Sequence, residues 1–156
     1  LPAFPRASTF LPDPKVARVI ANNCPKAFGL KDFHSLSDET NSEDGFLNWS
    51  TFNKFLSDRV ARFLSQMAAT EDPLGEGSLL DNTIVLYGSG TSTTHNARNY
   101  PLILAGGSNF GLRHGRFIKQ RAERPLGDFF LTMLHRFDIT VRSFAERASD
   151  FSEIVA

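Results

Sequence analysis

The stretch LLDNTIVLYGSGTSTTHNARNYPLILAGG, residues 79–107, decides the fold that we expect for this chain. Its first apolar run, residues 83–87, has no alternation of polar and apolar side chains, so we expect both of its faces to be covered. A second apolar run, residues 102–105, follows Pro101 and stops at two glycines. Uninterrupted apolar runs are typical of strands buried between helices. The sequence therefore predicts an α/β fold with a mainly parallel sheet flanked by helices.

The polar residues between the two runs are where we expect a functional site. The first run ends in Gly88-Ser89-Gly90, and His95 and Asn96 follow after small hydroxyl residues. In open α/β sheets, ligands bind beyond the carboxyl ends of the strands. The serine does not stand in a nucleophile-elbow motif, so we interpret it as a tight-turn residue.

Two segments have the apolar period of amphipathic helices, namely residues 45–70 and 125–137. Residues 15–21 favour a strand, and residues 26–44 are loop-like. Residues 116–119 are a candidate short strand, residues 139–144 a short strand or an extended segment, and residues 145–156 a surface tail. Four prolines in residues 1–14 favour an extended arm. We thus expect an arm at 1–14 and a single α/β domain over 15–156.

Composition excludes several classes of protein. The 17 basic side chains balance the 17 acidic ones, so bulk charge favours neither a nucleic-acid partner nor a membrane surface. No apolar run reaches the roughly 18 residues of a membrane span. The single Cys24 excludes an internal disulfide and a zinc cluster made of cysteines. Because the chain begins with Leu1 rather than Met, we expect this start to be a processed or truncated end.

Three side chains form the candidate metal site. Asp32 and His34 lie two residues apart in the loop-like region, and His95 lies in the loop after the first predicted strand. Carboxylate and imidazole ligands suit a divalent zinc or manganese ion, or iron, better than calcium. The alternative is structural, because Asp32 can simply orient His34 within a solvated loop, and His95 can bond to backbone.

Arg98 and Arg116 are candidate anion-binding residues, since a guanidinium offers paired donors to phosphate or sulfate. The alternative is that both are ordinary surface charges.

The sequence resembles a bacterial family that is known as domain of unknown function 1552 and is uncharacterised. The resemblance rests on DPLGEGSLLDNT at 72–83, VLYGSG at 85–90, HN at 95–96, Asn99, PL at 101–102 and LAGG at 104–107. Asp32-x-His34-Ser35-Leu36-Ser37 followed by Asn41 is similar to the histidine-rich loop of that family. The resemblance spans roughly residue 13 to the C-terminus.

That family is similar to the alkaline phosphatase and sulfatase superfamily, and the resemblance implies its fold and chemistry. The implied fold is a mainly parallel sheet between helices, with metal ligands at the carboxyl ends of strands. Asp32, His34 and His95 are the ligands that carry over. The superfamily's nucleophile lies far upstream, so the chain is expected to be the C-terminal portion of a larger domain. The resemblance also implies an exported or periplasmic protein, partnered by the missing N-terminal half or another chain.

Two functions remain open at this point. The first is a metal-dependent ester hydrolase of the phosphatase or sulfatase kind, in which a metal activates water or a hydroxyl nucleophile. The second is a non-catalytic binding or structural module of the same fold in an exported assembly. Gly90 stands where the superfamily has an acidic metal ligand, and this favours the second function.

Overall fold

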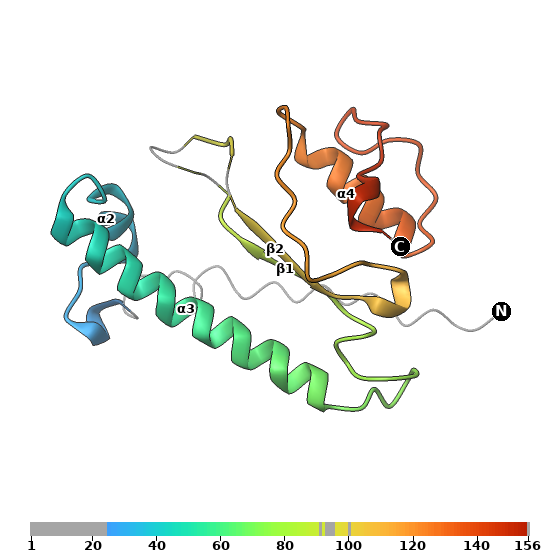
Figure 1. The fold of residues 1–156 in the computed structure, drawn as a ribbon, viewed down its shortest axis with the longest axis horizontal. Helices are drawn as coiled ribbons and strands as arrows, with labels where there is room; N and C mark the ends of the chain where they lie inside the picture. The colour runs from blue at the N-terminus through green and yellow to red at the C-terminus, as the bar shows by residue number, and fades with distance from the viewer. Residues whose placement is uncertain (1–24, 91, 93–95, 100, 156) are drawn as a thin grey trace. The chain divides into compact units, whose positions relative to one another are not determined.

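The computed structural model describes residues 25–90, 92, 96–99 and 101–155 of the 156-residue chain. The expected arm at 1–14, the expected strand at 15–21, Cys24 and His95 lie outside the described residues. The elements in chain order are η1 (Pro25–Phe28), α2 (Phe33–Asp38), α3 (Glu43–Ala69), β1 (Ile84–Gly88), β2 (Leu102–Gly106), η3 (Ser108–Phe110), α4 (Leu126–Arg136) and η4 (Ser152–Ile154) (Figure 1).

The chain divides into two compact units between Arg62 and Phe63, within the long helix α3. The first unit holds η1, α2 and most of α3, and the second holds the last turns of α3 and everything after it. Each unit has its own buried side chains. They are therefore described separately.

The helices of the first unit begin at side-chain caps. The Asp32 carboxylate accepts a hydrogen bond from Ser35 N at 3.2 Å and so caps α2. The Ser42 hydroxyl accepts one from Gly45 N at 3.1 Å at the start of α3. The helix predicted over 45–70 is confirmed, whereas the loop predicted over 26–44 is wrong in part, because α2 lies within it. A six-residue helix is too short to show an apolar period.

Aromatic rings make the core of the first unit. Leu36 of α2 and Phe52 of α3 are 2% and 3% exposed. Phe33 packs against both Trp49 and Phe52, with ring centroids 5.3 and 5.8 Å apart. Phe55 extends this contact by stacking near Phe52. Residues of the apolar stripe of α3 thus pack against Phe33 of α2, whereas the expected fold packs this stripe against a sheet.

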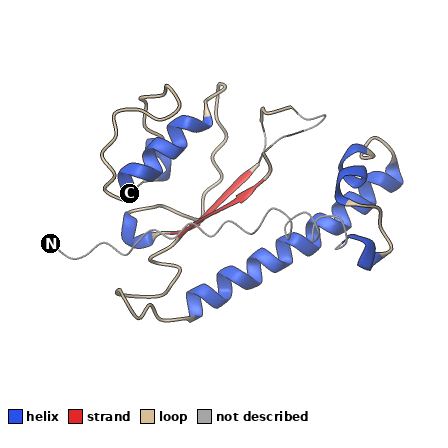
Figure 2. Ribbon diagram, turned by 180° about the vertical axis from the view of Figure 1, so that it is seen from behind, coloured by secondary structure: helices blue, strands red, loops and turns tan. Residues whose placement is uncertain are grey.

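The second unit is built on an antiparallel hairpin. β1 pairs with β2 in one register, with Ile84 opposite Gly106 and Gly88 opposite Leu102. The two runs predicted to be strands are confirmed as strands. The predicted mainly parallel sheet flanked by helices is wrong: the described residues hold one two-stranded antiparallel sheet (Figure 2).

The connection between the strands explains this correction. Adjacent parallel strands need a crossover that returns the chain to the starting end of the sheet, usually through a helix. β2 instead begins beside the end of β1, because Leu102 lies opposite Gly88. The uninterrupted apolar runs predict strands that are buried on both faces, yet the β1 side chains at 84–87 are half-buried. An apolar run indicates where burial is favourable and says nothing of the direction of the neighbouring strand.

The C-terminal region packs around α4. The predicted helix over 125–137 is confirmed, with Pro125 as its N-cap residue. Phe129 and Leu131 of α4 are buried, and so is Ile154 of η4, at 5% exposure. The predicted surface tail at 145–156 is therefore wrong in part. Neither of the short strands considered at 116–119 and 139–144 forms.

None of the helices within the described residues combines the length and the apolar character that a bilayer crossing requires.

Gly106, at the end of β2, tests the hairpin geometry. Its φ is +74°, and an added Cβ would meet Thr83 O and lie 2.7 Å from Leu80 O. Gly115 has φ +72° with nothing within 4 Å of an added Cβ, so it is the matched control. We predict that Gly106→Ala lowers the free energy of unfolding by more than about 3 kcal/mol, against about 1 kcal/mol for Gly115→Ala. Urea unfolding followed by circular dichroism measures both, and equal losses would contradict the observed close approach.

Candidate functional site

Asp32, the first predicted metal ligand, is a helix cap in the structure. Its Oδ1 accepts from Ser35 N at 3.2 Å and its Oδ2 accepts from the Ser35 hydroxyl at 2.9 Å. These hydrogen bonds, with the hydroxyl one the larger, lower the pKa of the Asp32 carboxyl. The signal for Asp32 as a ligand is its position two residues before a histidine, whereas an Asp directly before a helix is also a common N-cap residue.

His34 lies on the first turn of α2, one turn before Asp38. Its Nε2 is 3.2 Å from Asp38 Oδ2, and the two side chains are 73% and 46% exposed. An i,i+4 pair of this kind is usual on a solvated helix face. The structure therefore gives Asp32 and His34 local partners within the first unit.

The third predicted ligand, His95, lies outside the described residues, so the proposed convergence of all three ligands stays a prediction. Within the part of the chain that the structure describes, no group of three or more His, Cys, Asp or Glu side chains is placed to hold a metal ion.

The two predicted anion-binding arginines have separate partners. Arg98 Nη1 lies 3.2 Å from Glu123 Oε1, and both side chains are about three-quarters exposed, at 69% and 75%. The Arg116 guanidinium donates to the backbone oxygen of Glu153. Their role in binding an anion stays a prediction.

The sequence did not predict a polar cluster that lies at the base of the hairpin. Asp81 accepts hydrogen bonds from the hydroxyl and backbone N–H of Ser78 at 2.7 and 2.8 Å, and from the Ser108 hydroxyl at 2.5 Å. These bonds, that of Ser108 being the largest cause, lower the pKa of Asp81 to about 2. The cluster therefore holds a negative charge between the turn before β1 and the turn after β2.

Two amides extend this polar cluster. Asn109 Nδ2 donates to Glu76 O at 2.9 Å and to Asn82 Oδ1 at 2.8 Å, and Asn82 Nδ2 donates to the same Glu76 O at 2.9 Å. The pattern Ser-x-x-Asp-Asn in residues 78–82 was the signal available in the sequence, since Ser, Asp and Asn favour turns that bond to backbone. These side chains form hydrogen bonds within the cluster, so we interpret the cluster as structural.

A buried carboxylate, Asp128 of α4, is the second feature that the sequence did not indicate. It is 1% exposed and lies between Arg124 Nε, at 3.3 Å, and Arg147 Nε, at 3.2 Å. Burial raises the pKa of Asp128, but the hydrogen bonds and charges of Arg147 and Arg124 outweigh it and the net shift is downward. Arg124 also pairs with Glu153 at 3.1 Å and covers the Phe151 ring at 4.4 Å. This arrangement fastens the C-terminal segment to α4.

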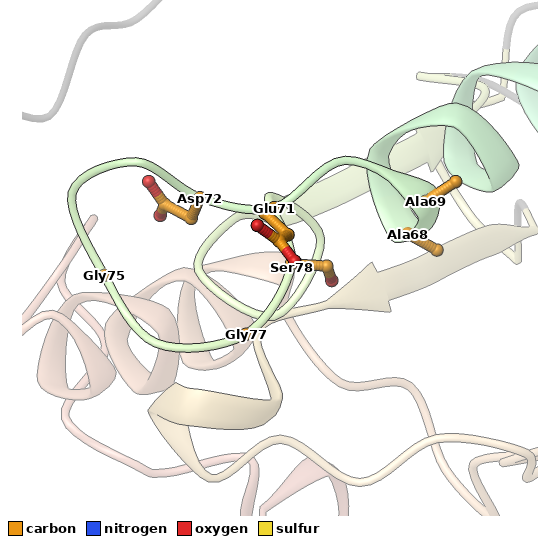
Figure 3. A pocket seen from close by; sticks show the side chains of 7 residues that line it. All are labelled: Ala68, Ala69, Glu71, Asp72, Gly75, Gly77 and Ser78. Carbon is orange, nitrogen blue, oxygen red and sulfur yellow. The ribbon is translucent and has the colours of Figure 1, made fainter.

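A shallow hollow lies at the end of α3, between the helix and the turn that follows it (Figure 3). Glu71 lies beside Ser78 there, whereas the Asp72 carboxylate points away from both (Figure 3). Asp72 Oδ1 accepts from Leu74 N at 2.9 Å and so stabilises the turn. The residues that line the hollow are Ala68, Ala69, Glu71, Asp72, Gly75, Gly77 and Ser78. The polar side chains of this lining are two carboxylates and one hydroxyl, and the Ser78 hydroxyl donates to Asp81 at 2.7 Å.

Comparison of the chain with models of known families, with curated proteins and with solved structures found no match.

The lowered pKa of Asp81 predicts a pH dependence of stability. A carboxyl group whose pKa is lower in the folded than in the unfolded protein stabilises the fold above its ordinary value of 3.8, and this contribution is lost as the pH falls toward about 2. We therefore expect Asp81→Asn to destabilise the protein at pH 7. We also expect this variant to lose less stability than the parent protein as the pH falls from 3.8 to about 2. Chemical unfolding at a series of pH values measures this effect.

The matched control is Asp58→Asn, which removes an exposed carboxylate paired only with Lys54 on α3. This variant should keep the acid dependence of the parent protein. If both variants follow the parent curve, the hydrogen bonds of Asp81 do not stabilise the fold.

Proposed function

We propose that this chain is a non-catalytic binding and structural module, and that its β1–β2 hairpin pairs with another polypeptide segment to complete a larger sheet. The resemblance of the sequence to the phosphatase- and sulfatase-like family suggests the context, which is an exported assembly.

The observation that carries this proposal is the isolation of the hairpin. Among the described residues, β1 and β2 pair only with each other, so each strand has an outer edge without a strand partner. An isolated two-stranded hairpin is marginally stable in water, and three or more strands are usually needed. An open strand edge offers unpaired N–H and C=O groups to another chain.

The side chains of the hairpin support the same function. Leu102 and Ile103 of β2 are 36% and 52% exposed, and those of β1 at 84–87 are only half-buried. Exposed apolar side chains gathered on one element indicate a surface that another protein covers. The most specific residues of the resemblance, 74–107, also include both strands.

The contacts of the predicted site residues favour a non-catalytic role. Asp32 caps a helix, and His34 pairs with Asp38. Arg98 and Arg116 are each engaged by a group of this chain. Four of the five predicted site residues thus have a partner within this chain, and this supports a non-catalytic role.

The second candidate is the metal-dependent hydrolase, with Asp32, His34 and His95 as ligands of zinc or manganese. The residues of the resemblance favour it, because they place His95 in the loop after β1, as the superfamily places a metal ligand. In this function the metal would activate water or a hydroxyl group supplied by another segment.

Metal content and hydrolysis separate the two candidates. The purified chain is equilibrated with zinc or manganese, dialysed and analysed for bound metal, then assayed with p-nitrophenyl phosphate and p-nitrophenyl sulfate. We expect less than about 0.1 metal ion per chain and no hydrolysis above that of the free metal, because the described residues form no three-ligand group.

The double variant His34→Ala/His95→Ala is the control for metal binding. One metal ion per chain that disappears in this variant, together with hydrolysis of either substrate, would contradict the module proposal and establish the second candidate. His114→Ala/His135→Ala removes two histidines outside the predicted site and controls for loss of imidazole alone.

A further inference from the structure

Residues 113–121, with the sequence RHGRFIKQR, form a segment that the functions above leave unexplained. It carries four basic side chains and no acidic one, in a chain whose formal net charge is zero. We call it the basic segment. It belongs to the long loop that joins η3 to α4, without helix or strand (Figure 1).

The ends of the basic segment are fixed. Leu112 is buried and bridges to Val155, and Arg113 N donates to Ile154 O at 2.9 Å. Arg116 reaches the backbone oxygen of Glu153, and Arg124, just beyond the segment, binds the buried Asp128. The segment is therefore held in place by the C-terminal residues and α4.

Exposure alternates along the second half of the segment. Phe117, Lys119 and Arg121 are exposed, whereas Ile118 and Gln120 are half-buried. This alternation is typical of an extended chain, whose side chains point to opposite sides in turn, so we interpret these three side chains as one outward row. Phe117 is 91% exposed, more than any other large hydrophobic side chain of the described residues.

Within the described residues, the basic segment has charged side chains without an ion-pair partner and backbone groups without a backbone partner. Within the described residues, Arg113, Lys119 and Arg121 form no ion pair. In the same part of the chain, residues 114–123 make no backbone–backbone hydrogen bond. An anchored chain with free N–H and C=O groups is able to accept an added strand, and its side-chain row then selects the partner.

We propose that residues 116–121 bind an extended acidic segment of a partner protein by strand addition. Carboxylates two residues apart on the partner face Lys119 and Arg121, and an apolar side chain packs on Phe117. Opposite charges directly across two strands stabilise their pairing, and like charges destabilise it. Nucleic acid and membrane are less favoured, because the segment has one aromatic ring and because neither partner would use the free backbone groups.

A short peptide tests this proposal with the full chain. The probe Thr-Glu-Thr-Glu-Thr-Val-Thr, labelled with fluorescein, places its valine opposite Phe117 and its glutamates opposite Lys119 and Arg121 in antiparallel pairing. Fluorescence anisotropy at low salt is expected to show saturable binding that weakens as salt is added. Amide hydrogen exchange should slow at alternate residues of 116–121 when the peptide is bound.

Charge reversal supplies the decisive comparison. We expect Lys119→Glu/Arg121→Glu to weaken peptide binding by about tenfold or more, since two attractive cross-strand pairs become repulsive. Phe117→Ser should weaken it by about threefold to tenfold. Arg142→Glu reverses an exposed arginine outside the segment and should change binding by less than about twofold. Far-ultraviolet circular dichroism confirms that each variant is folded.

Four results would overturn the proposal. They are equal binding by the double variant, equal binding of the scrambled peptide Glu-Glu-Thr-Thr-Val-Thr-Thr, absence of binding by the probe, and preference for another ligand. The last is measured with an oligothymidylate and with vesicles containing 30% phosphatidylserine. This test is independent of the hairpin, because the basic segment lies outside β1 and β2.

Discussion

The antiparallel pairing of β1 with β2 is the constraint on which the second unit depends. It brings the turn before β1 next to the turn after β2, where Gly107 N donates to Leu80 O at 2.9 Å. Asp81 then accepts a hydrogen bond from Ser108, and this joins residues that are 27 positions apart. The close approach at Gly106 follows from the same geometry, because only a residue without Cβ fits there.

The acidic residues with lowered pKa values all act as acceptors of hydrogen bonds from this chain. Asp32 is held by Ser35, Asp81 by Ser108 and Ser78, and Asp128 by its two arginines. Each carboxylate joins pieces of chain, and Asp81 and Asp128 do so over 19 positions or more. Perturbed carboxyl groups often mark catalytic sites, but ion pairs and helix caps lower a pKa in the same way. Here the geometry favours the structural explanation.

The sequence predicted which residues form α3, α4, β1 and β2, because the apolar period and the apolar runs directly reflect burial. It did not predict the direction of the strands, because an apolar run reflects burial and not the direction of its neighbour. Helix α2 and the pair of Asp81 with Ser108 were also missed, because a short helix has no period and contacts distant in sequence leave no local pattern. The prediction that Asp32 and His34 bind a metal rests on their chemistry as ligands. Their observed partners are the neighbouring residues Ser35 and Asp38.

The central claim is that, within the part of the chain that the structure describes, β1 and β2 pair only with each other and leave their outer edges open. Amide hydrogen exchange of the isolated chain, resolved by residue over 84–88 and 102–106, tests it most directly. The account predicts that the amides facing the partner strand exchange slowly and that the alternating amides on each outer edge exchange almost as fast as in an unfolded chain. Slow exchange at successive residues along either strand would contradict it, because both edges of that strand would then be paired.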